Sequence, residues 1–389
     1  MQSLDVVVIG GGNLGLWTAY HLARRGAGSI AVCERHWCGF GATTRSAGMM
    51  RQQGGTETAI KLGKWSRDLY LQLGAELGLD SGFVQTGYYV LATSPRERDA
   101  FKDLVALRRA CGVENEWVDP DEGRRRCPWI TWDGLYGATY TAGDGYVHPP
   151  IVARNITLAV ARCDGVSVYE RCPVTAIERH GSRFRVQTPR GGIEAERVVN
   201  AGGPRGARAL GAMLDVEVPV SAMRHHIAVY ATIGEQMPRG FPMAVVLSQG
   251  YYVRPEEQGA LLGLSSAGEQ ADHSELFQME FDWPAFEAAR PHWEHLFPAL
   301  RGLRMARAWT GAVDYTPDHL PIIDQPLPGY FVLAAGGHGM MWGPALGLKM
   351  AELMADGRVG DLPDSEVRLG RFADGRTVHD PIALPFPTS

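Results

Sequence analysis

Three glycines near the start of the chain have the spacing of a loop that binds phosphate. Gly10, Gly12 and Gly15 follow an apolar run at residues 5–9 and precede a segment with helical apolar spacing. In such a loop the first glycine permits a tight turn, the second lets a pyrophosphate approach the backbone, and the third lets the helix pack on the strand. Glu34 ends a second apolar run, where a carboxylate accepts hydrogen bonds from ribose hydroxyls. These residues predict a dinucleotide site at a helix N-terminus.

The rest of the chain favours FAD over NAD as the dinucleotide. After Glu34 the chain enters a stretch of small and polar residues, 39–48, that suits contact with a long, extended cofactor. A later predicted strand at 197–204 ends in glycines, which is typical of flavoproteins. A third predicted strand at 330–335 leads through the glycine loop 336–339 into a helix. The N-terminus of that helix would stabilise the negative charge of a reduced flavin.

Four segments of the chain carry a resemblance to a known family. They lie at residues 8–12, 45–53, 144–149 and 316–324, the last followed by the glycine loop. Together they resemble the D-amino-acid oxidase superfamily of FAD enzymes. Within it, the resemblance points to the branch of sarcosine oxidase, the sarcosine oxidase β-subunit, dimethylglycine dehydrogenase and glycine oxidase. It covers nearly the whole chain, and it is specific for the superfamily but not for a substrate.

The resemblance implies a mixed fold, α/β and α+β, with two discontinuous domains. Residues 1–85, 145–215 and 311–389 would form a Rossmann-like FAD-binding domain. Residues 86–144 and 216–310 would form a β-sheet-based substrate domain over the flavin.

Local patterns in the second insertion and in the tail complete the predicted architecture. Residues 224–232 and 250–255 have the pattern of strands, as a sheet requires. Residues 282–300 are predicted to form a helix that breaks at Pro291. The tail from Asp361 onward, which contains several prolines, is predicted to be coil.

The predicted FAD contacts lie on the glycine loops, at the ends of the nucleotide-side strands and on the early polar stretch. They are Gly10, Gly12, Asn13, Leu14, Gly15, Glu34, Arg35, Thr43, Thr44, Arg45, Ser46, Val174, Ala201, Gly202, Gly337, His338, Gly339, Met340 and Met341. The resemblance also implies that the FAD is bound non-covalently. Covalent relatives attach flavin through a cysteine or a histidine, and Gly311 and Arg45 stand in those places. We expect no metal site.

The reaction of the resembled family removes a hydride from the carbon next to an amine nitrogen. The flavin accepts the hydride, and the protein positions the substrate, so no side-chain base is required when the amine binds neutral. The candidate catalytic residues are Arg51, Tyr252, His338 and His226. Arg51 matches an arginine that holds the substrate carboxylate in sarcosine oxidase, and a guanidinium can hold a carboxylate through two parallel hydrogen bonds.

Each candidate also has a structural interpretation. Arg51 could bind an FAD phosphate or lie on the surface, Tyr252 could pack in the core of a strand, and His338 could stabilise only its own loop. Tyr252 falls where sarcosine oxidase has its oxygen-activating lysine, and near a substrate tyrosine of glycine oxidase. His225 and His226 alternate on a predicted strand, so at most one of them faces the cavity.

Two departures from the family pattern concern the substrate carboxylate. The carboxylate-binding lysine of sarcosine oxidase is replaced by Met341, and the substrate arginine of glycine oxidase is replaced by Val313. Arg51 is therefore the remaining anchor among those the family uses. The apolar replacements favour an amine that is bulkier or less charged than a simple α-amino acid.

Composition excludes several other classes of protein. The chain has 389 residues, 21% of them charged, and a formal net charge of −5, which gives no electrostatic reason to expect nucleic acid or an anionic membrane as partner. No apolar run approaches the ~18 residues of a membrane span, and we expect no signal peptide. Six scattered cysteines without a C-x-x-C pair are typical of a reducing cytoplasm.

The sequence as a whole predicts an FAD-dependent amine or amino acid oxidase or dehydrogenase. It would oxidise the C–N bond of an amine, or of an N-methyl, cyclic or D-amino acid, by hydride transfer to flavin. Its partners would be that small substrate and an electron acceptor, oxygen or another, and an oligomeric state stays open. Two alternatives remain: an FAD-dependent 2-hydroxy-acid dehydrogenase, and a flavin-binding subunit of a hetero-oligomeric oxidase.

Overall fold

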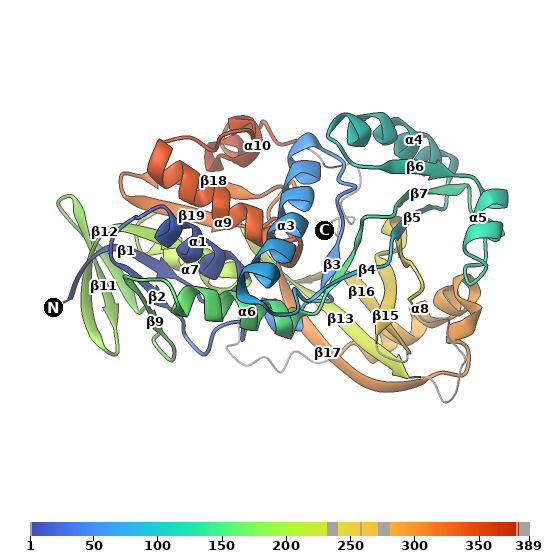
Figure 1. Cartoon of the computed structure of the whole chain (residues 1–389), viewed down its shortest axis with the longest axis horizontal. Coiled ribbons are helices and arrows are strands. Elements are labelled where there is room, and N and C mark those ends of the chain that lie inside the picture. The colour runs from blue at the N-terminus through green and yellow to red at the C-terminus, as the bar shows by residue number, and fades with distance from the viewer. Residues whose placement is uncertain (1, 232–239, 257–258, 271–280, 379, 381–389) are drawn as a thin grey trace.

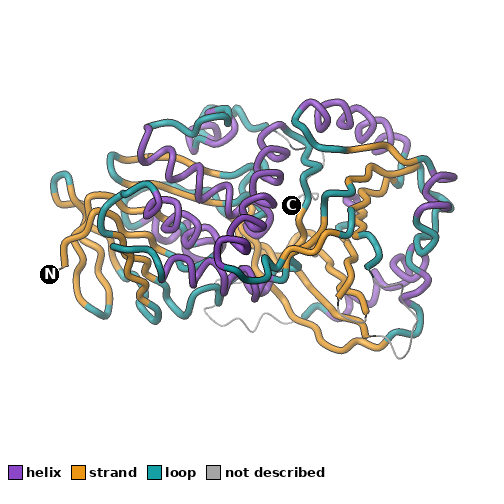
Figure 2. The backbone as a smooth tube through the Cα atoms, viewed as in Figure 1, coloured by secondary structure: helices purple, strands orange, loops and turns teal. Residues whose placement is uncertain are grey.

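Two large sheets, one in each half of the molecule, dominate the computed structural model (Figure 1). The structure describes residues 2–231, 240–256, 259–270, 281–378 and 380, without the side chains of 266–270. Helices cover the sheet on the N-terminal side, whereas strands make up most of the other half (Figure 2). The arrangement confirms the predicted mixed α/β and α+β class with a Rossmann-like half.

The first sheet is built around the N-terminal strand. β1 pairs in parallel with β2 on one side and with β12 on the other, and the valines at its centre are fully buried. Burial on both faces explains why this strand is a continuous apolar run. In order across the sheet, the strands are β10 (Ala176–His180), β11 (Arg183–Thr188), β12 (Gly191–Asn200), β1 (Gln2–Ile9), β2 (Ile30–Cys33) and β9 (Val166–Tyr169). In addition, β19 (Tyr330–Ala334) lies beside β12, and β18 (Ile322–Leu327) lies beside β19.

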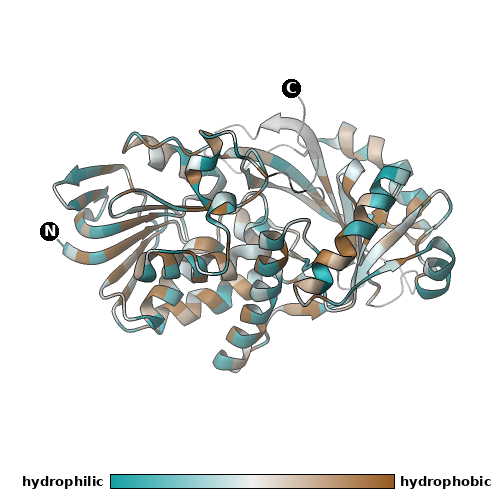
Figure 3. Ribbon diagram, turned by 90° about the horizontal axis from the view of Figure 1, so that it is seen from above, coloured by the Kyte–Doolittle hydropathy of each residue, from teal (hydrophilic) through white to brown (hydrophobic). Residues whose placement is uncertain are grey.

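Helices pack on both faces of the first sheet. One face is covered by α1 (Asn13–Arg24), α3 (Glu57–Leu77), α6 (Pro149–Ala161) and α9 (Gly339–Asp356), and the other by α7 (Gly203–Ala212). Apolar and polar residues both occur along the helices (Figure 3), and α1 and α9 are buried over most of their length. Because helices cover both faces of this sheet, it is accessible at its edge, where the carboxyl ends of β1 and β2 point toward the second sheet.

The second sheet provides the wall opposite the first. Its strands are β17 (Arg304–Tyr315), β13 (Ser221–Ala231), β16 (Gly259–Gln270), β15 (Tyr251–Glu256), β14 (Met243–Val246), β5 (Tyr88–Ala92), β7 (Gly137–Thr141) and β6 (Asn115–Val118). One face packs on α8 (Trp283–Leu296), and the other packs on α4 (Pro95–Ala110) and faces the first half of the molecule. A small sheet of β3 (Met49–Met50), β8 (Gly145–Val147) and β4 (Phe83–Gln85) lies between the two large ones (Figure 1).

Some local expectations differ from the structure. α8 continues through Pro291 because Phe286, Trp293 and Leu296 anchor it in the core on both sides of the proline. The tail from Asp361 is not all coil: it contains α10 (Asp364–Val367) and the 3₁₀ turn Leu369–Phe372. The domain boundaries stay a prediction, and β17 runs across the expected boundary at residue 311.

A buried ion pair holds the tail against the body of the molecule. Arg371 donates from Nε and Nη2 to the two carboxylate oxygens of Asp318, at 2.7 and 2.9 Å, and both side chains are buried. Arg371 also donates to the carbonyl of Leu320 at 3.1 Å. This ion pair fixes the 316–321 loop. The loop leads into β18 and then into β19, the strand before the last glycine loop.

Arg371→Ala should lower the free energy of unfolding by about 3–5 kcal/mol, because it leaves the Asp318 carboxylate buried without its partner. The measurement is denaturant unfolding of the FAD-loaded protein. Arg368→Ala is the control, since Arg368 pairs with Asp364 on the surface and such pairs contribute at most about 1 kcal/mol. If the two substitutions lowered the free energy of unfolding equally, the Arg371–Asp318 ion pair would not have the stabilising role inferred for it.

Candidate active site

A single continuous cavity joins the two halves of the described structure. Its volume is about 330 Å³, and it extends from the carboxyl ends of β1 and β2 to the inner face of the second sheet. Residues from the first glycine loop, the early polar stretch, α7, the last glycine loop and five strands of the second sheet all line it. Segments far apart in sequence thus meet around one space.

The first glycine loop forms a phosphate cradle at one end of this cavity. Gly10 has a φ of +111°, which a residue with a Cβ rarely adopts. A Cβ on Gly15 would lie 1.9 Å from the carbonyl oxygen of Gly10, so the third glycine allows the close packing of α1 on β1. The amides of Gly12 and Leu14, at the start of α1, have no hydrogen-bond partner among the described residues. They are available to phosphate oxygens.

Charged side chains flank the cradle. The Glu34 carboxylate accepts hydrogen bonds from the amides of Gly11, at 2.7 Å, and His36, at 2.8 Å, and still lines the cavity. Arg35, Arg45 and Arg205 line the same end. Burial and a neighbouring arginine lower the pKa of Arg45 and of Arg205. A diphosphate would relieve this crowding of positive charge.

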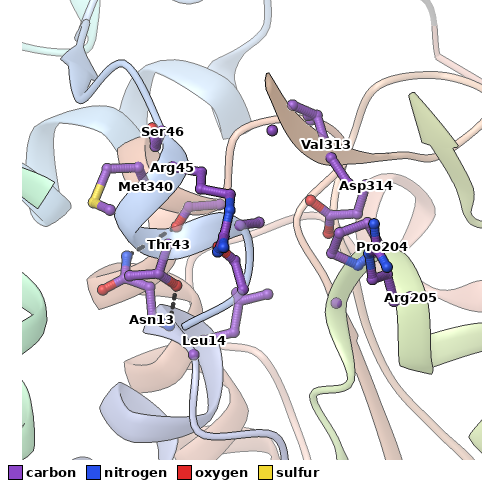
Figure 4. A pocket seen from close by; sticks show the side chains of 18 of the residues that line it. Asn13, Leu14, Thr43, Arg45, Ser46, Pro204, Arg205, Val313, Asp314 and Met340 are labelled. Carbon is purple, nitrogen blue, oxygen red and sulfur yellow. Dashed lines mark hydrogen bonds between the residues drawn. The ribbon is translucent and has the colours of Figure 1, made fainter. Parts of the chain in front are cut away.

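One asparagine connects the first and last glycine loops. The Asn13 side-chain amide donates to the carbonyl of Gly339 at 2.9 Å and to the Tyr70 hydroxyl at 2.8 Å, and that hydroxyl donates to the carbonyl of Met340 at 2.8 Å. The Asn13 backbone amide donates to the Thr43 hydroxyl at 3.0 Å (Figure 4). The cradle, the early polar stretch and the start of α9 are therefore held in one fixed arrangement.

The start of α9 provides a second set of amides facing the cavity. Gly337 has a φ of +99°, and a Cβ there would lie 2.6 Å from the Tyr315 ring. Asp314 accepts a hydrogen bond from the amide of Ala335 at 2.8 Å and points into the cavity (Figure 4). Burial raises the pKa of Asp314 to about 6.

Arg51 lies where the cavity reaches the second sheet. Its side chain is buried, its Nε has no hydrogen-bond partner, and its guanidinium forms no ion pair or hydrogen bond among the described residues, although its charge opposes the rise that burial causes in the pKa of the nearby Asp144. Burying a charge without a partner is costly. A guanidinium in this position is ready to bind an anion from the cavity, and a carboxylate is the anion whose geometry it matches best.

The two candidate histidines on β13 point in opposite directions. His226, which we expected in the cavity, lies on the other face of the sheet against Phe281 and does not line it. His225 lines the cavity instead, and its Nε2 lies 3.0 Å from the Tyr315 hydroxyl. Alternation along a strand explains the difference, because it allows one histidine inside but does not say which. Burial lowers the pKa of His225 to about 4, so its ring is neutral.

Tyr252 and His338 both line the cavity, as expected. The Tyr252 ring lies over Gly263 on the neighbouring strand, where a Cβ would come within 1.9 Å of it. His338 stacks on Trp342, with ring centroids 4.0 Å apart. Burial, and to a lesser degree the charge of Arg51, keep the pKa of His338 well below its usual value. Both groups are therefore uncharged.

Most of the predicted cofactor contacts line the cavity, and two do not. Thr44 donates to the carbonyl of Gly39 instead, and Gly15 lies beneath the cradle as a packing residue. Those that do are Gly10, Gly12, Asn13, Leu14, Glu34, Arg35, Thr43, Arg45, Ser46, Val174, Ala201, Gly202, Gly337, His338, Gly339, Met340 and Met341. Their contacts with FAD stay predictions.

Sequence reasoning missed several residues of the cavity wall, among them Tyr88, His225 and Tyr315. Tyr88 begins β5 and Tyr315 ends β17, and no local spacing in the sequence relates two positions so far apart. The alternation at 225–226 indicated that one of the two histidines faces the cavity. It did not indicate which of them lies on that face of the sheet.

The described residues contain neither a membrane-spanning helix nor a metal-binding cluster. No helix among them has the length and apolar character needed to cross a membrane. No group of three His, Cys, Asp or Glu side chains in the described part is arranged to hold a metal ion.

Comparison with known proteins agrees with the geometry. Human mitochondrial sarcosine dehydrogenase is 30% identical over 97% of this chain and 42% of that protein. Sarcosine oxidase subunit beta from Rhodobacter capsulatus is 28% identical over 97% of this chain and 91% of that protein. The crystal structure of L-proline dehydrogenase from P. horikoshii has a TM-score of 0.87 at 26% identity, over 97% of this chain and 100% of that one.

The chain thus spans less than half the length of the mitochondrial relative. The model of the family described as FAD dependent oxidoreductase matches residues 5–353, which include both glycine loops and most of both large sheets. The resemblance seen in the sequence is confirmed, and so is FAD as the cofactor. The chain belongs to the family of FAD dependent oxidoreductases.

Proposed function

We propose that the protein oxidises the carbon–nitrogen bond of an amino or imino acid by hydride transfer to FAD. The observation that carries this proposal is Arg51, a buried guanidinium that faces the cavity without a partner among the described residues. Two of the similar proteins are named for sarcosine and L-proline, compounds that contain both an amine and a carboxylate. Such a substrate would supply the anion that Arg51 lacks.

The residues around Arg51 fit a substrate whose amine is neutral when it reacts. FAD, when bound, supplies the hydride acceptor. The charge of Arg51 disfavours a protonated amine nearby, and His225 and His338 are uncharged, so neither ring offers a negative counter-charge for one. The acidic residues that line the cavity within the described part are Glu34, at the nucleotide end, and Asp314, beside the last glycine loop. The protein therefore acts mainly by binding the carboxylate and orienting the adjacent carbon.

Replacing Arg51 tests the proposal directly. A hydrogen bond to a charged group contributes roughly 1.5–3 kcal/mol, so Arg51→Ala should lower kcat/KM by about 10- to 150-fold. Arg51→Lys should restore part of the loss, because lysine keeps the charge but lacks the planar fork. Steady-state kinetics with N-methyl, cyclic and D-amino acids is the measurement.

The controls separate substrate binding from cofactor binding. Arg98→Ala removes an exposed arginine that pairs with Asp99 on α4, and it should leave kcat/KM unchanged. FAD content should stay normal in all three variants. If Arg51→Ala purifies without flavin, Arg51 belongs to the cofactor site. If it keeps both its flavin and its full activity, the substrate is not held by Arg51.

The FAD should be released by acid precipitation. Gly311 and Arg45 line the cavity at the positions where covalent relatives have nucleophiles, and neither can form a flavin bond. Cys33 also lines the cavity, but burial raises the pKa of its thiol to about 12, so it stays protonated and unreactive. The test is a denaturing gel viewed for flavin fluorescence, and fluorescence that stays with the protein band would refute non-covalent binding.

Oxygen should be a slower electron acceptor than an artificial dye. A cation near the flavin stabilises developing superoxide, and Tyr252 stands in the place of the lysine that supplies it in sarcosine oxidase. Arg254 does not compensate, because it lies outside the cavity and is bound to the Ala47 carbonyl and to Glu256, at 2.6 Å each. Turnover under saturating substrate is compared with oxygen and with dye; peroxide formed as fast as the dye is reduced would show that the inference is wrong.

A second candidate function is that of a flavin-binding subunit in a hetero-oligomer. The observation in its favour is the similarity to a protein named as a subunit, sarcosine oxidase subunit beta, over 91% of that protein. Purification from the native host followed by size measurement tests it, since a subunit would elute with a partner. We also propose a cytoplasmic location, which the six free cysteines support.

A further inference from the structure

The inner face of the second sheet presents one row of side chains to the cavity. Ile227 on β13, Gly263 on β16, Tyr252 on β15 and Val245 on β14 are direct partners across neighbouring strands. Directly opposed residues in a sheet project to the same face. Ile227, Tyr252 and Val245 all line the cavity, which places an apolar wall opposite the glycine loops.

Gly263 shapes this wall because it has no side chain. A Cβ at this position would lie 1.9–2.2 Å from atoms of the Tyr252 ring, so the ring occupies the space that a side chain would fill. The aromatic ring therefore lies across the sheet beside Ile227 and Val245 instead of standing up into the cavity. Leu247, from the turn after β14, extends the apolar surface.

Among the described residues that line this region, the charged side chains are Arg51 and Asp314. Arg51 lines the cavity there, and the hydroxyl-bearing neighbours Tyr88, Tyr252 and Tyr315 are neutral because burial raises the pKa of each phenol. No carboxylate among the described residues of the second sheet's inner face lines the cavity except Asp314, which is bound to the amide of Ala335. A second charge on a substrate would find no partner at the apolar wall.

We propose that the site selects amino or imino acids whose substituent is apolar and branched or cyclic, and that the wall of Ile227, Val245, Leu247 and Tyr252 binds that substituent. This inference rests on the proposed function, because it assigns the substrate class of the same site. The carboxylate binds at Arg51, and the apolar group lies against the sheet. Sarcosine, whose backbone carries no such group, leaves the wall uncovered, and acids with a second charge are rejected.

Binding of unreactive carboxylates to the FAD-loaded protein tests the wall without requiring catalysis. Titrations followed by the flavin absorption spectrum compare propanoate, 4-methylpentanoate and pentanedioate. Three additional buried carbon atoms should tighten binding of 4-methylpentanoate over propanoate by about 10- to 60-fold. Pentanedioate, with its second charge, should bind no more tightly than propanoate.

Matched variants assign the effect to the wall. Ile227→Ala should reduce the preference for 4-methylpentanoate over propanoate by about 3- to 10-fold, because it removes carbon atoms that contact the branched group. Val229→Ala is the control: Val229 lies two residues along the same strand, in the same apolar cluster, but does not line the cavity. It should leave the preference unchanged. FAD content of each variant shows that the fold is retained.

Anaerobic bleaching of the flavin separates this inference from the proposed function. Both enantiomers of N-methylleucine and of proline are compared with sarcosine. Faster bleaching by the larger acids supports both proposals. Sarcosine reacting as well as the larger acids, or an unchanged preference in Ile227→Ala, overturns the inference alone. Bleaching by none of these amines, with 4-methylpentanoate still bound more tightly, overturns the proposed function and leaves the apolar wall in place.

Discussion

The hydrogen bonds of Asn13 are the constraint on which the cofactor site depends. This residue begins α1, yet its side chain binds the carbonyl of Gly339 at the start of α9, 326 positions later. Through Tyr70 it also fixes Met340. Two helices thereby start at the same cavity, and their free amides add to a positive end that suits an anionic, dinucleotide cofactor. Together with the close packing of α1 on α9, this contact fixes the two glycine loops relative to each other.

Unlike Asn13, which has several hydrogen-bond partners, the Arg51 guanidinium has no hydrogen-bond or ion-pair partner within the described structure. Tyr88 and His338 beside it are neutral. The buried Asp144 and Arg108 lie close enough that, besides the effect of burial, the charge of Arg51 lowers the pKa of each, but neither forms an ion pair with it among the described residues. Keeping a buried cation in this state costs stability. A site that needs an anion to be complete is a common arrangement for ligand binding, and here it is placed at the junction of the cofactor end and the sheet.

The cofactor half could be predicted from the sequence largely because its signals are local. The glycine spacing at Gly10 to Gly15, the strand before it and Glu34 lie within one short segment, and each has a single physical role. The substrate half depends on register between distant strands. That His225 rather than His226 faces the cavity, and that Tyr88 and Tyr315 meet there, follows from pairing that no local pattern specifies. The passage of α8 through Pro291 likewise depended on core contacts.

The division of the apolar core has a consequence for how this protein can change. Val245 and Ile227 belong to one cluster, whereas the residues beneath the glycine loops, such as Val8 and Leu14, belong to another. Substitutions that share no partners have additive effects on stability. The wall of the second sheet can therefore be remodelled by single replacements without disturbing the cradle, so that acceptance of new substrates and retention of the flavin are separate problems for selection and for design alike.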